Sequence, residues 1–337
     1  MAREKDKKNR GQDRGGGQGQ SRDVQISKAL SLLLRHAAEK EGLKMNAQGY
    51  ANVADVLQWR KLKSIKCTFD EIKHAVDSSD KKRFALLHIP SSQPTESTTK
   101  ATTIPESDSA EDSASVDNTA VLEAPVTSEQ QSDATQQALA ATDSKPANYL
   151  IRASQGHSIK SVDAASFLEP LSLDDESKLP ETVVHGTFHG AWPLILQSGG
   201  LRCMNRNHVH FATGPSLESA LAAQQESQES KQGPGDKKVI SGMRWDAQVL
   251  IYIDIRKALQ AGCPFWRSEN GVILSEGLPV SEAGDGAAGA AERVVPVEFF
   301  DVVIERKAQM GKIWEKGQVL QELPAKLTSK GTPKNRR

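Results

Sequence analysis

The feature that most constrains this chain is a long acidic stretch that cannot form a hydrophobic core. Residues 91–145 contain ten Asp and Glu against Lys100 and Lys145, a net charge of −8, and are otherwise rich in Ser, Thr, Ala and Gln. Segments of this composition bury too little apolar surface to offset the entropy lost on ordering. We therefore expect residues 91–145 to be a disordered insert, with the folded structure built from the segments around it.

The insert separates two segments with the character of strands. Residues 83–89 and 148–152 are short runs rich in aliphatic and aromatic side chains. The entropy of closing a loop grows only slowly with its length, so a hairpin tolerates a long insert at its tip. We expect these two strands to pair despite the insert.

Three helices are expected before the first strand. Residues 26–37 have apolar side chains at helical spacing, Asn52 is a candidate N-cap for a second short helix, and Thr68 with Glu71 forms a capping-box pattern for a third. Three short helices followed by two strands is the order of a winged-helix lobe. We assign residues 24–90 and 146–157 to such a lobe.

The pattern changes from about residue 158 to short strands with few helices. One helix is expected at 191–197, stopped by Gly199 and Gly200. The expected strands cover residues 182–184, 208–212, 249–255, 271–274 and 302–305. We predict a mixed, mainly β lobe over residues 158–310, which makes the whole chain an α+β protein.

The ends of the chain are basic. Residues 1–23 carry seven Lys and Arg against four acids, and residues 325–337 carry five bases and no acid. We expect residues 1–23 to be a disordered basic tail and residues 311–337 a basic C-terminal tail. Outside the insert the chain has a net charge of +8, which suits a polyanion such as RNA. Solubilising tails explain the charge equally well.

The cysteines indicate a reducing compartment. Cys67, Cys203 and Cys263 lie far apart and form no C-x-x-C pair, so neither a disulfide framework nor a thiolate zinc site is expected. No apolar run approaches the roughly 18 residues that cross a bilayer. We expect a monomer with no membrane partner, in the cytoplasm, the nucleus or both.

One glycine pattern imitates a dinucleotide-binding fingerprint. Residues 284–289 satisfy G-x-G-x-x-G, but that motif requires a strand before it and a full helix after it. Here Pro296 ends any helix within about one turn. We do not expect a Rossmann fold.

Two other clusters suit a phosphate. Arg35 and His36 close the first helix, which taken alone is usual for a solvated helix end favoured by the macrodipole. The loop after the second strand, residues 152–158, adds a guanidinium, an amide, an imidazole and a hydroxyl around one glycine. Such a loop can anchor a phosphate through charge-assisted hydrogen bonds and close backbone approach.

Histidines mark a third cluster. His208 and His210 face the same side of an expected strand, a spacing that suits either a metal or two hydrogen-bonded structural histidines. No carboxylate or thiolate stands nearby as a third ligand, so we expect no metal. A strand that runs into His185, Gly186 and Thr187 is a weak signal by itself.

These motifs together resemble the RNA 2′-phosphotransferase family. They occur in the family's order between about residues 26 and 305. The resemblance implies a winged-helix lobe joined to an ADP-ribosyltransferase-like lobe that binds NAD without a Rossmann fold. The matching segments are residues 27–36, 41–43, 80–86, 151–158, 184–187, 191–193, 204–211, 239–244 and 267–274.

The resemblance also implies roles for individual residues. The catalytic set is Arg35, His36, Arg152 and Arg206. The phosphate- and RNA-binding set is Gln155, His157 and Ser158, and the NAD-binding set is His185, Gly186, Thr187, His208, His210 and Val272. Val272 stands where many other ADP-ribosyltransferases have a catalytic Glu, with Glu269 offset. The chain departs from the family pattern at Ser154, where Asn is usual, and at Gly190, where a larger residue is usual.

The family's reaction is the last step of tRNA splicing. The 2′-phosphate of tRNA or RNA attacks the NAD ribose and expels nicotinamide; a ribose hydroxyl then attacks the phosphate. The products are 2′-hydroxyl RNA and ADP-ribose 1″,2″-cyclic phosphate, and no metal is required. Two other readings remain: an ADP-ribosyltransferase that leaves ADP-ribose on a terminal phosphate or a protein side chain, and a non-catalytic winged-helix nucleic-acid-binding adaptor.

Overall fold

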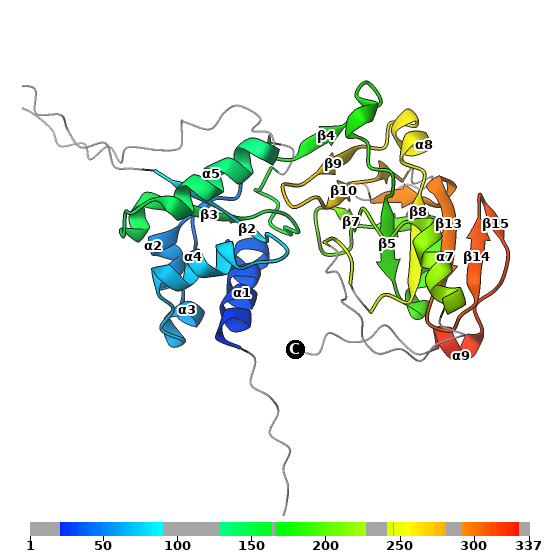
Figure 1. Cartoon of the computed structure of the whole chain (residues 1–337), viewed down its shortest axis with the longest axis horizontal. Helices are drawn as coiled ribbons and strands as arrows, with labels where there is room; N and C mark the ends of the chain where they lie inside the picture. The colour runs from blue at the N-terminus through cyan, green and yellow to red at the C-terminus, as the bar shows by residue number, and fades with distance from the viewer. Residues whose placement is uncertain are drawn as a thin grey trace, which may run out of the picture.

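The computed structural model describes residues 21–89, 128–163, 166–226, 241–244, 246–280 and 292–329. They form two lobes, which lie side by side in Figure 1, the N-terminal lobe at the left. Both lobes mix helices and strands, which confirms an α+β protein. Within these ranges no helix has the length and apolar character to cross a membrane. The glycine pattern at 284–289 lies outside them.

Three of the helices that precede strand β2 (Phe84–His88) were predicted from the sequence, whereas the short helix over residues 60–64 was not. The predicted first helix is confirmed, with Ile26, Leu30 and Leu33 buried. Asn52 accepts a hydrogen bond from the Ala54 N–H at 2.8 Å, and the predicted capping box at Thr68 is present. The elements are α1 (Arg22–Leu32), a π-helical turn (Leu33–Ala37), α2 (Val53–Gln58), α3 (Arg60–Ser64) and α4 (Phe69–Asp77).

A three-stranded sheet completes this lobe, with β3 (Tyr149–Ala153) between β1 (Ala51–Asn52) and β2 (Phe84–His88). β2 and β3 are antiparallel, with Phe84 opposite Ala153 and His88 opposite Tyr149. The strands on either side of the insert therefore pair, as predicted.

The prediction of disorder was wrong for residues 128–145. Helix α5 (Ser128–Ala140) covers part of this range and packs along β2 (Figure 1). Its buried face carries Ala138 together with two polar residues, Gln131 and Thr135. The Thr135 hydroxyl accepts a hydrogen bond from the Leu86 N–H at 3.2 Å. Composition could not reveal this helix, because its buried side chains are small or polar and depend on partners elsewhere.

The described residues of the C-terminal lobe form three sheets. The largest has the order β15-β14-β13-β8-β5, a second β4-β9-β10-β7, and a third β11-β12-β6. A single bridge between Val184 and Ala212 links β5 to the end of β7. The strands are β4 (Glu169–Leu171), β5 (Val184–Thr187), β6 (Gly200–Arg202), β7 (Val209–Phe211), β8 (Val249–Ile253), β9 (Phe265–Arg267), β10 (Ile273–Ser275), β11 (Leu278–Pro279), β12 (Arg293–Pro296), β13 (Phe300–Glu305), β14 (Gly311–Glu315) and β15 (Gln318–Val319).

Each of the five predicted strands of this lobe overlaps an observed strand, although the strand expected at 182–184 begins only at Val184. The sequence did not predict β4, β6, β9, β11, β12, β14 or β15. The predicted helix at 191–197 is α6 (Trp192–Gln197). The remaining helices are α7 (Leu217–Glu226), α8 (Ile255–Gln260) and α9 (Ala325–Thr328).

The prediction of a tail from residue 311 was wrong as far as residue 329. Strand β14 pairs with β13, and its side chains Ile313 and Trp314 are 1% and 8% exposed. The basic composition at the very end of the chain hid a short strand whose apolar residues complete the sheet.

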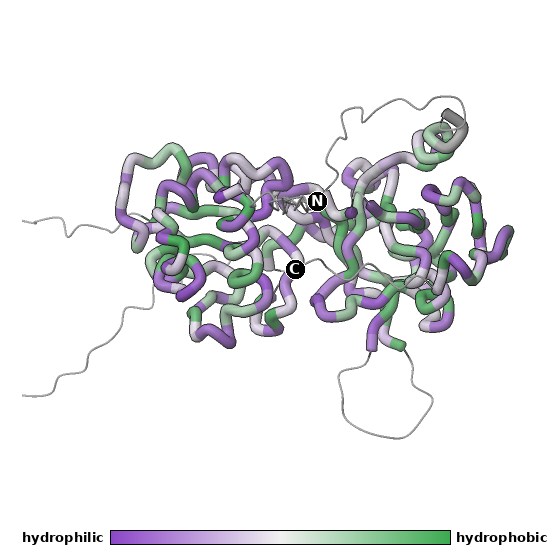
Figure 2. Tube along the Cα trace, turned by 90° about the horizontal axis from the view of Figure 1, so that it is seen from below, coloured by the Kyte–Doolittle hydropathy of each residue, from purple (hydrophilic) through white to green (hydrophobic). Residues whose placement is uncertain are grey.

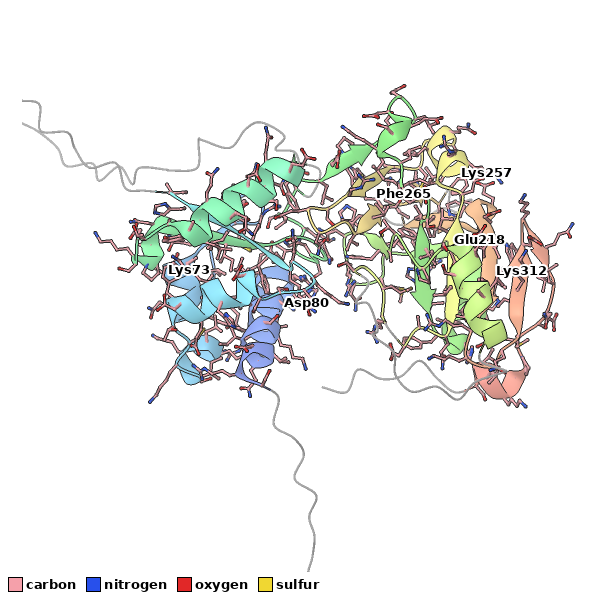
Figure 3. All side chains as sticks on the ribbon, in the orientation of Figure 1. Lys73, Asp80, Glu218, Lys257, Phe265 and Lys312 are labelled. Carbon is pink, nitrogen blue, oxygen red and sulfur yellow. The ribbon has the colours of Figure 1, made fainter. Side chains whose placement is uncertain are left out.

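A separate apolar cluster joins the lobes. Figure 2 shows apolar segments gathered inside each lobe and polar segments outside. Between the two main cores, Ala38 of the N-terminal lobe packs with Val272 and Leu274 of the C-terminal lobe. Asp80, labelled in Figure 3, lies at the edge of the N-terminal lobe that faces the C-terminal lobe, and the neighbouring Lys81 carbonyl accepts a hydrogen bond from Asn270 Nδ2 at 2.7 Å.

Candidate active site

Arg35 and His36 lie on the π-helical turn that ends the first helix. Such turns are rare and occur often at functional sites, because the extra residue changes the direction of the side chains. Leu33 and Leu34 anchor the turn with no exposed surface. His36 Nδ1 lies 2.9 Å from the Ser158 hydroxyl. The turn therefore presents both polar side chains to the loop that follows β3.

Gly156 allows that loop to approach the turn closely. Its φ of +87° is one that favours glycine. A Cβ added there would lie 3.5 Å from His210 Nε2 and 3.6 Å from Arg35 Cδ. The Ser158 N–H also donates to the Arg35 carbonyl at 2.9 Å. Arg35 and His210, from different lobes, thus both lie close to one glycine.

Arg152 is buried, with 1% of its surface exposed. Its guanidinium lies between two rings, 5.0 Å from the centroid of Tyr50 and 4.1 Å from that of Phe167. Nη2 donates to the Gln131 side-chain oxygen. The stacking fixes the plane of the guanidinium, and Nε and Nη1 have no hydrogen-bond partner in the part of the chain that the structure describes.

Partnerless buried polar atoms concentrate at this site. Among the described residues nine buried side-chain nitrogen or oxygen atoms have no hydrogen-bond partner, and five belong to Arg35 (Nε, Nη2), Arg152 (Nε, Nη1) and His157 (Nε2). Leaving a buried polar group unsatisfied costs about 1–3 kcal/mol. A ligand with several acceptor oxygens and negative charge would satisfy them together, and a phosphate dianion has both properties.

Arg206 brings a third cation to the site from the turn before β7. Burial, the Arg206 charge and the Arg83 charge together lower the pKa of Arg35 to about 10. Burial lowers the pKa of His36, and Arg206 and Arg35 lower it further. In the described ranges no ion pair neutralises Arg35, Arg152 or Arg206. The site has the electrostatics of an anion-binding site.

The structure brings together the four residues of the predicted catalytic set. Arg35 and Arg152 are both close enough to His157 to lower its pKa, and Arg206 acts on Arg35 and His36. Among the predicted phosphate-binding residues, Ser158 contacts His36, and His157 lies edge-on to the ring of Phe167 with 5.9 Å between centroids.

Three histidines beside the arginines are linked through backbone carbonyls. His185 Nδ1 donates to the His210 carbonyl at 2.9 Å, and His210 Nδ1 donates to the His208 carbonyl at 3.0 Å. Since a carbonyl only accepts, both Nδ1 atoms carry the proton, and a neutral ring then accepts at Nε2. His210 Nε2 lies 3.0 Å from the side-chain oxygen of Gln155; because Nε2 also accepts, the hydrogen bond requires the Gln155 amide in the opposite orientation, with its NH₂ group toward the ring.

The remaining residues of the predicted NAD-binding set differ in accessibility. His185 is half-buried, whereas Thr187, His208 and His210 are 7%, 7% and 8% exposed. Val272 has no exposed surface, and its N–H donates to the Ser268 hydroxyl at 3.1 Å. Val272 therefore belongs to the apolar cluster between the lobes.

The side chains of Met243 and Ala247 pack against Gly186 and leave no room for a larger residue. A Cβ there would lie 2.4 Å from Met243 Cγ and 2.9 Å from Ala247 Cβ. We expect Gly186→Ala to lower the free energy of unfolding by about 1–3 kcal/mol through overpacking, measured by urea unfolding. Met243→Ala in the same chain should recover part of that loss. An unchanged unfolding midpoint for Gly186→Ala would contradict the packing account.

Burial keeps several site histidines neutral. It lowers the pKa of His208 to about 4 and that of His210 well below its ordinary value. Burial, helped by the charges of Arg35 and Arg152, lowers the pKa of His157 to about 3. The 3.8 Å contact between His208 and Glu276 is therefore not an ion pair near neutral pH.

The neutral His157 makes stability sensitive to acid. The unfolded chain binds a proton at this residue below about pH 6.5, while the folded protein does not until about pH 3. The free energy of unfolding should fall as pH drops through this window, by up to about 1.4 kcal/mol per pH unit from this group. Urea unfolding at several pH values measures the slope. His157→Gln removes the titrating group, so the slope of the unfolding free energy against pH should be smaller by up to about 1.4 kcal/mol per pH unit. An equal slope in the variant would refute the lowered pKa of His157.

Sequence reasoning missed the residues that surround Arg152. Gln131 lies in the acidic low-complexity stretch, and Tyr50 and Phe167 lie in irregular segments with no periodicity to mark them. The one available signal is chemical, since arginine in protein interiors commonly stacks on aromatic rings.

Comparisons with known proteins agree on one family. A model of the RNA 2′-phosphotransferase, Tpt1/KptA family matches residues 21–277. The tRNA 2′-phosphotransferase 1 of Danio rerio is 32% identical over 284 residues, 84% of this chain and 92% of that protein. The Homo sapiens protein of the same name is 33% identical over 77% of this chain and 71% of its own length. The Saccharomyces cerevisiae tRNA 2′-phosphotransferase is 32% identical, with coverage of 77% and 81%.

Proposed function

Because the chain belongs to the Tpt1/KptA family of RNA 2′-phosphotransferases, we propose that it is a tRNA 2′-phosphotransferase that removes the splice-junction 2′-phosphate of RNA. The observation that carries the proposal is the set of partnerless buried donors on Arg35 and Arg152, with Arg206 close by. Three cations that form no ion pair within the described residues can hold a phosphate dianion and stabilise the charge of its transition state.

We further propose NAD as the phosphate acceptor; it supplies an electrophilic ribose carbon and a neighbouring hydroxyl. The residues that would hold it are His185, Gly186 and Thr187 on β5, with His210 on β7. The half-buried His185 keeps Nε2 as a free acceptor because Nδ1 is engaged with the His210 carbonyl. A hydroxyl of a ribose is a suitable donor to that atom.

We also propose a fold type for each of the two lobes. The helices of the N-terminal lobe, followed by the β2–β3 pair, support a winged-helix lobe. The family membership supports an ADP-ribosyltransferase-like C-terminal lobe, in which the strand that carries His185 pairs with β8 at one edge of the largest sheet.

His36 is the proposed proton donor to the RNA 2′-oxygen. When the bond between phosphorus and this oxygen breaks, the oxygen gains charge, and a proton from the imidazole neutralises it. The Ser158 hydroxyl, 2.9 Å from His36 Nδ1, orients the ring so that Nε2 is the atom available to the leaving oxygen.

The lowered pKa of His36 predicts the pH dependence of the reaction. Burial and the charges of Arg206 and Arg35 place this pKa below its ordinary value of about 6.5. A general acid must be protonated, so kcat/KM should fall as pH rises above this lowered pKa. In the enzyme–substrate complex the phosphate dianion offsets the arginine charges and raises the pKa of His36. The decrease in kcat should therefore begin at a higher pH than the decrease in kcat/KM. Steady-state rates across the pH range measure both, and a kcat/KM that rises through this region would contradict the role.

The direct test is incubation of the protein with NAD and an oligonucleotide that has one internal 2′-phosphate. We expect 2′-hydroxyl RNA, nicotinamide and ADP-ribose 1″,2″-cyclic phosphate, identified by mass spectrometry. Stable ADP-ribose on the oligonucleotide would instead indicate an ADP-ribosyltransferase that stops after the first transfer. No NAD-dependent change in a folded protein that binds the oligonucleotide would indicate a non-catalytic adaptor.

A further inference from the structure

Helix α5 reaches the active site through one side chain. Gln131 is 5% exposed, and both ends of its amide are used. Its oxygen accepts from Arg152 Nη2, and its Nε2 donates to the Phe167 carbonyl at 2.9 Å. The same Phe167 places its ring 4.1 Å from the Arg152 guanidinium. One amide therefore joins the guanidinium to the backbone of the residue on which it stacks.

We infer that Gln131 is a positioning residue for Arg152, which makes α5 part of the active site. The inference rests on the proposed function, in which Arg152 contacts the phosphate. A free arginine side chain samples many rotamers, and ordering it costs up to about 2 kcal/mol. The Gln131 contact and the rings of Tyr50 and Phe167 hold the side chain in one rotamer before substrate binds. Gln131 uses one N–H of Nη2, and Nε and Nη1 have no partner among the described residues, so they remain available as donors to a ligand.

The neutrality of Gln131 is part of its role. A carboxylate in this position would accept the same hydrogen bond, but it would also form a buried ion pair and offset the charge that the phosphate needs. A neutral amide fixes the guanidinium and leaves its positive charge available. Gln131 also satisfies the Phe167 carbonyl, which a carboxylate cannot do because it has no N–H.

The same helix offers a matched control. Thr135 lies four residues after Gln131, on the same face of α5, and is 6% exposed. Its hydroxyl accepts from the backbone of Leu86 at 3.2 Å. Thr135→Val removes a polar contact that docks α5 on the sheet but leaves Arg152 untouched. Gln131→Met removes the contact to Arg152 with a similar side-chain volume.

The experiment compares the full-length wild type, Gln131→Met, Gln131→Glu and Thr135→Val with NAD and the 2′-phosphorylated oligonucleotide. We expect Gln131→Met to lower kcat about tenfold or more, with KM for NAD near that of the wild type, since NAD is held by other residues. Gln131→Glu keeps an acceptor for Arg152 and should lose at least as much. Thr135→Val should retain kcat within about twofold, although its unfolding midpoint falls like that of Gln131→Met.

The outcomes separate the inference from the proposed function. A wild type that transfers the phosphate, with Gln131→Met as active as Thr135→Val, would overturn the positioning role and leave the proposed function standing. A fully active Gln131→Glu would overturn the part of the inference that requires a neutral partner for Arg152, and it decides that part even if Gln131→Met does not fold. A folded wild type with no 2′-phosphate transfer would overturn both.

Discussion

Replacement of Arg35 by Ala should lower the rate of 2′-phosphate transfer about a thousandfold or more, with little change in the free energy of unfolding. Arg35 Nε and Nη2 are buried without partners, so no internal hydrogen bond from these atoms is lost. Leu33, Leu34 and Ala38 continue to anchor the turn. The loss therefore falls on the transition state, where one preorganised donor contributes about 10²–10³ in rate and a cation on a transferring phosphoryl group contributes more.

The matched control for Arg35→Ala is Arg60→Ala. Arg60 has a side chain 82% exposed and a surface ion pair with Glu41 at 2.9 Å, so its loss removes a positive charge from the same lobe without touching the site. Single-turnover transfer at saturating NAD measures both variants. Near-normal activity of a folded Arg35→Ala protein would remove the basis of the proposed function.

The second large effect is expected from His36→Ala, which should separate the two chemical steps. The proton donor is needed when the RNA 2′-oxygen leaves, and general acid catalysis contributes about 10²–10⁴ to such a step. The first transfer requires no proton on that oxygen. We therefore expect a slower-migrating RNA adduct to accumulate on a denaturing gel, together with release of nicotinamide. Because His36 is exposed, folding should be unaffected.

Arg152→Ala is expected to give the same adduct with a cost in stability, because it leaves a cavity between the rings of Tyr50 and Phe167. The pH dependence of the two variants distinguishes charge stabilisation from proton transfer, since only Arg152→Ala keeps the titrating donor. Raising the pH should not change the rate of His36→Ala through this group, since the titrating donor is absent, so the difference between this variant and the wild type should shrink as pH rises. If no site variant accumulates an adduct while nicotinamide is released, the two-step route is contradicted.

Local signals predicted much of the N-terminal lobe from sequence. Asn52 and Thr68 determine helix starts through hydrogen bonds to residues two or three positions away, so a short window contains the whole cause. The pairing of β2 and β3 was also predictable, because two strong strand segments flank a stretch that cannot compete with them. The resemblance to a family then supplied the residues that form the arginine cluster.

Distant contacts account for what the sequence did not reveal. The buried face of α5 depends on Leu86, Arg152 and Phe167 for its hydrogen bonds, and its own residues resemble a disordered stretch. Strand β14 becomes a strand by pairing with β13. The π-helical turn at Arg35 leaves no mark on apolar spacing, because Leu33 and Leu34 fit an ordinary helix equally well.

The position of the insert within the β2–β3 hairpin has a consequence for how the gene can change. The insert joins the end of the β2–β3 pair at which His88 lies opposite Tyr149. Arg152 lies opposite Ala85, toward the other end of the pair. Codons gained or lost between β2 and α5 therefore lengthen a connection that makes no demand on the register of the strands. A gain or loss between Gln131 and Arg152 would shift one partner relative to the other. We expect natural variants to differ widely in length before α5 and hardly at all after it.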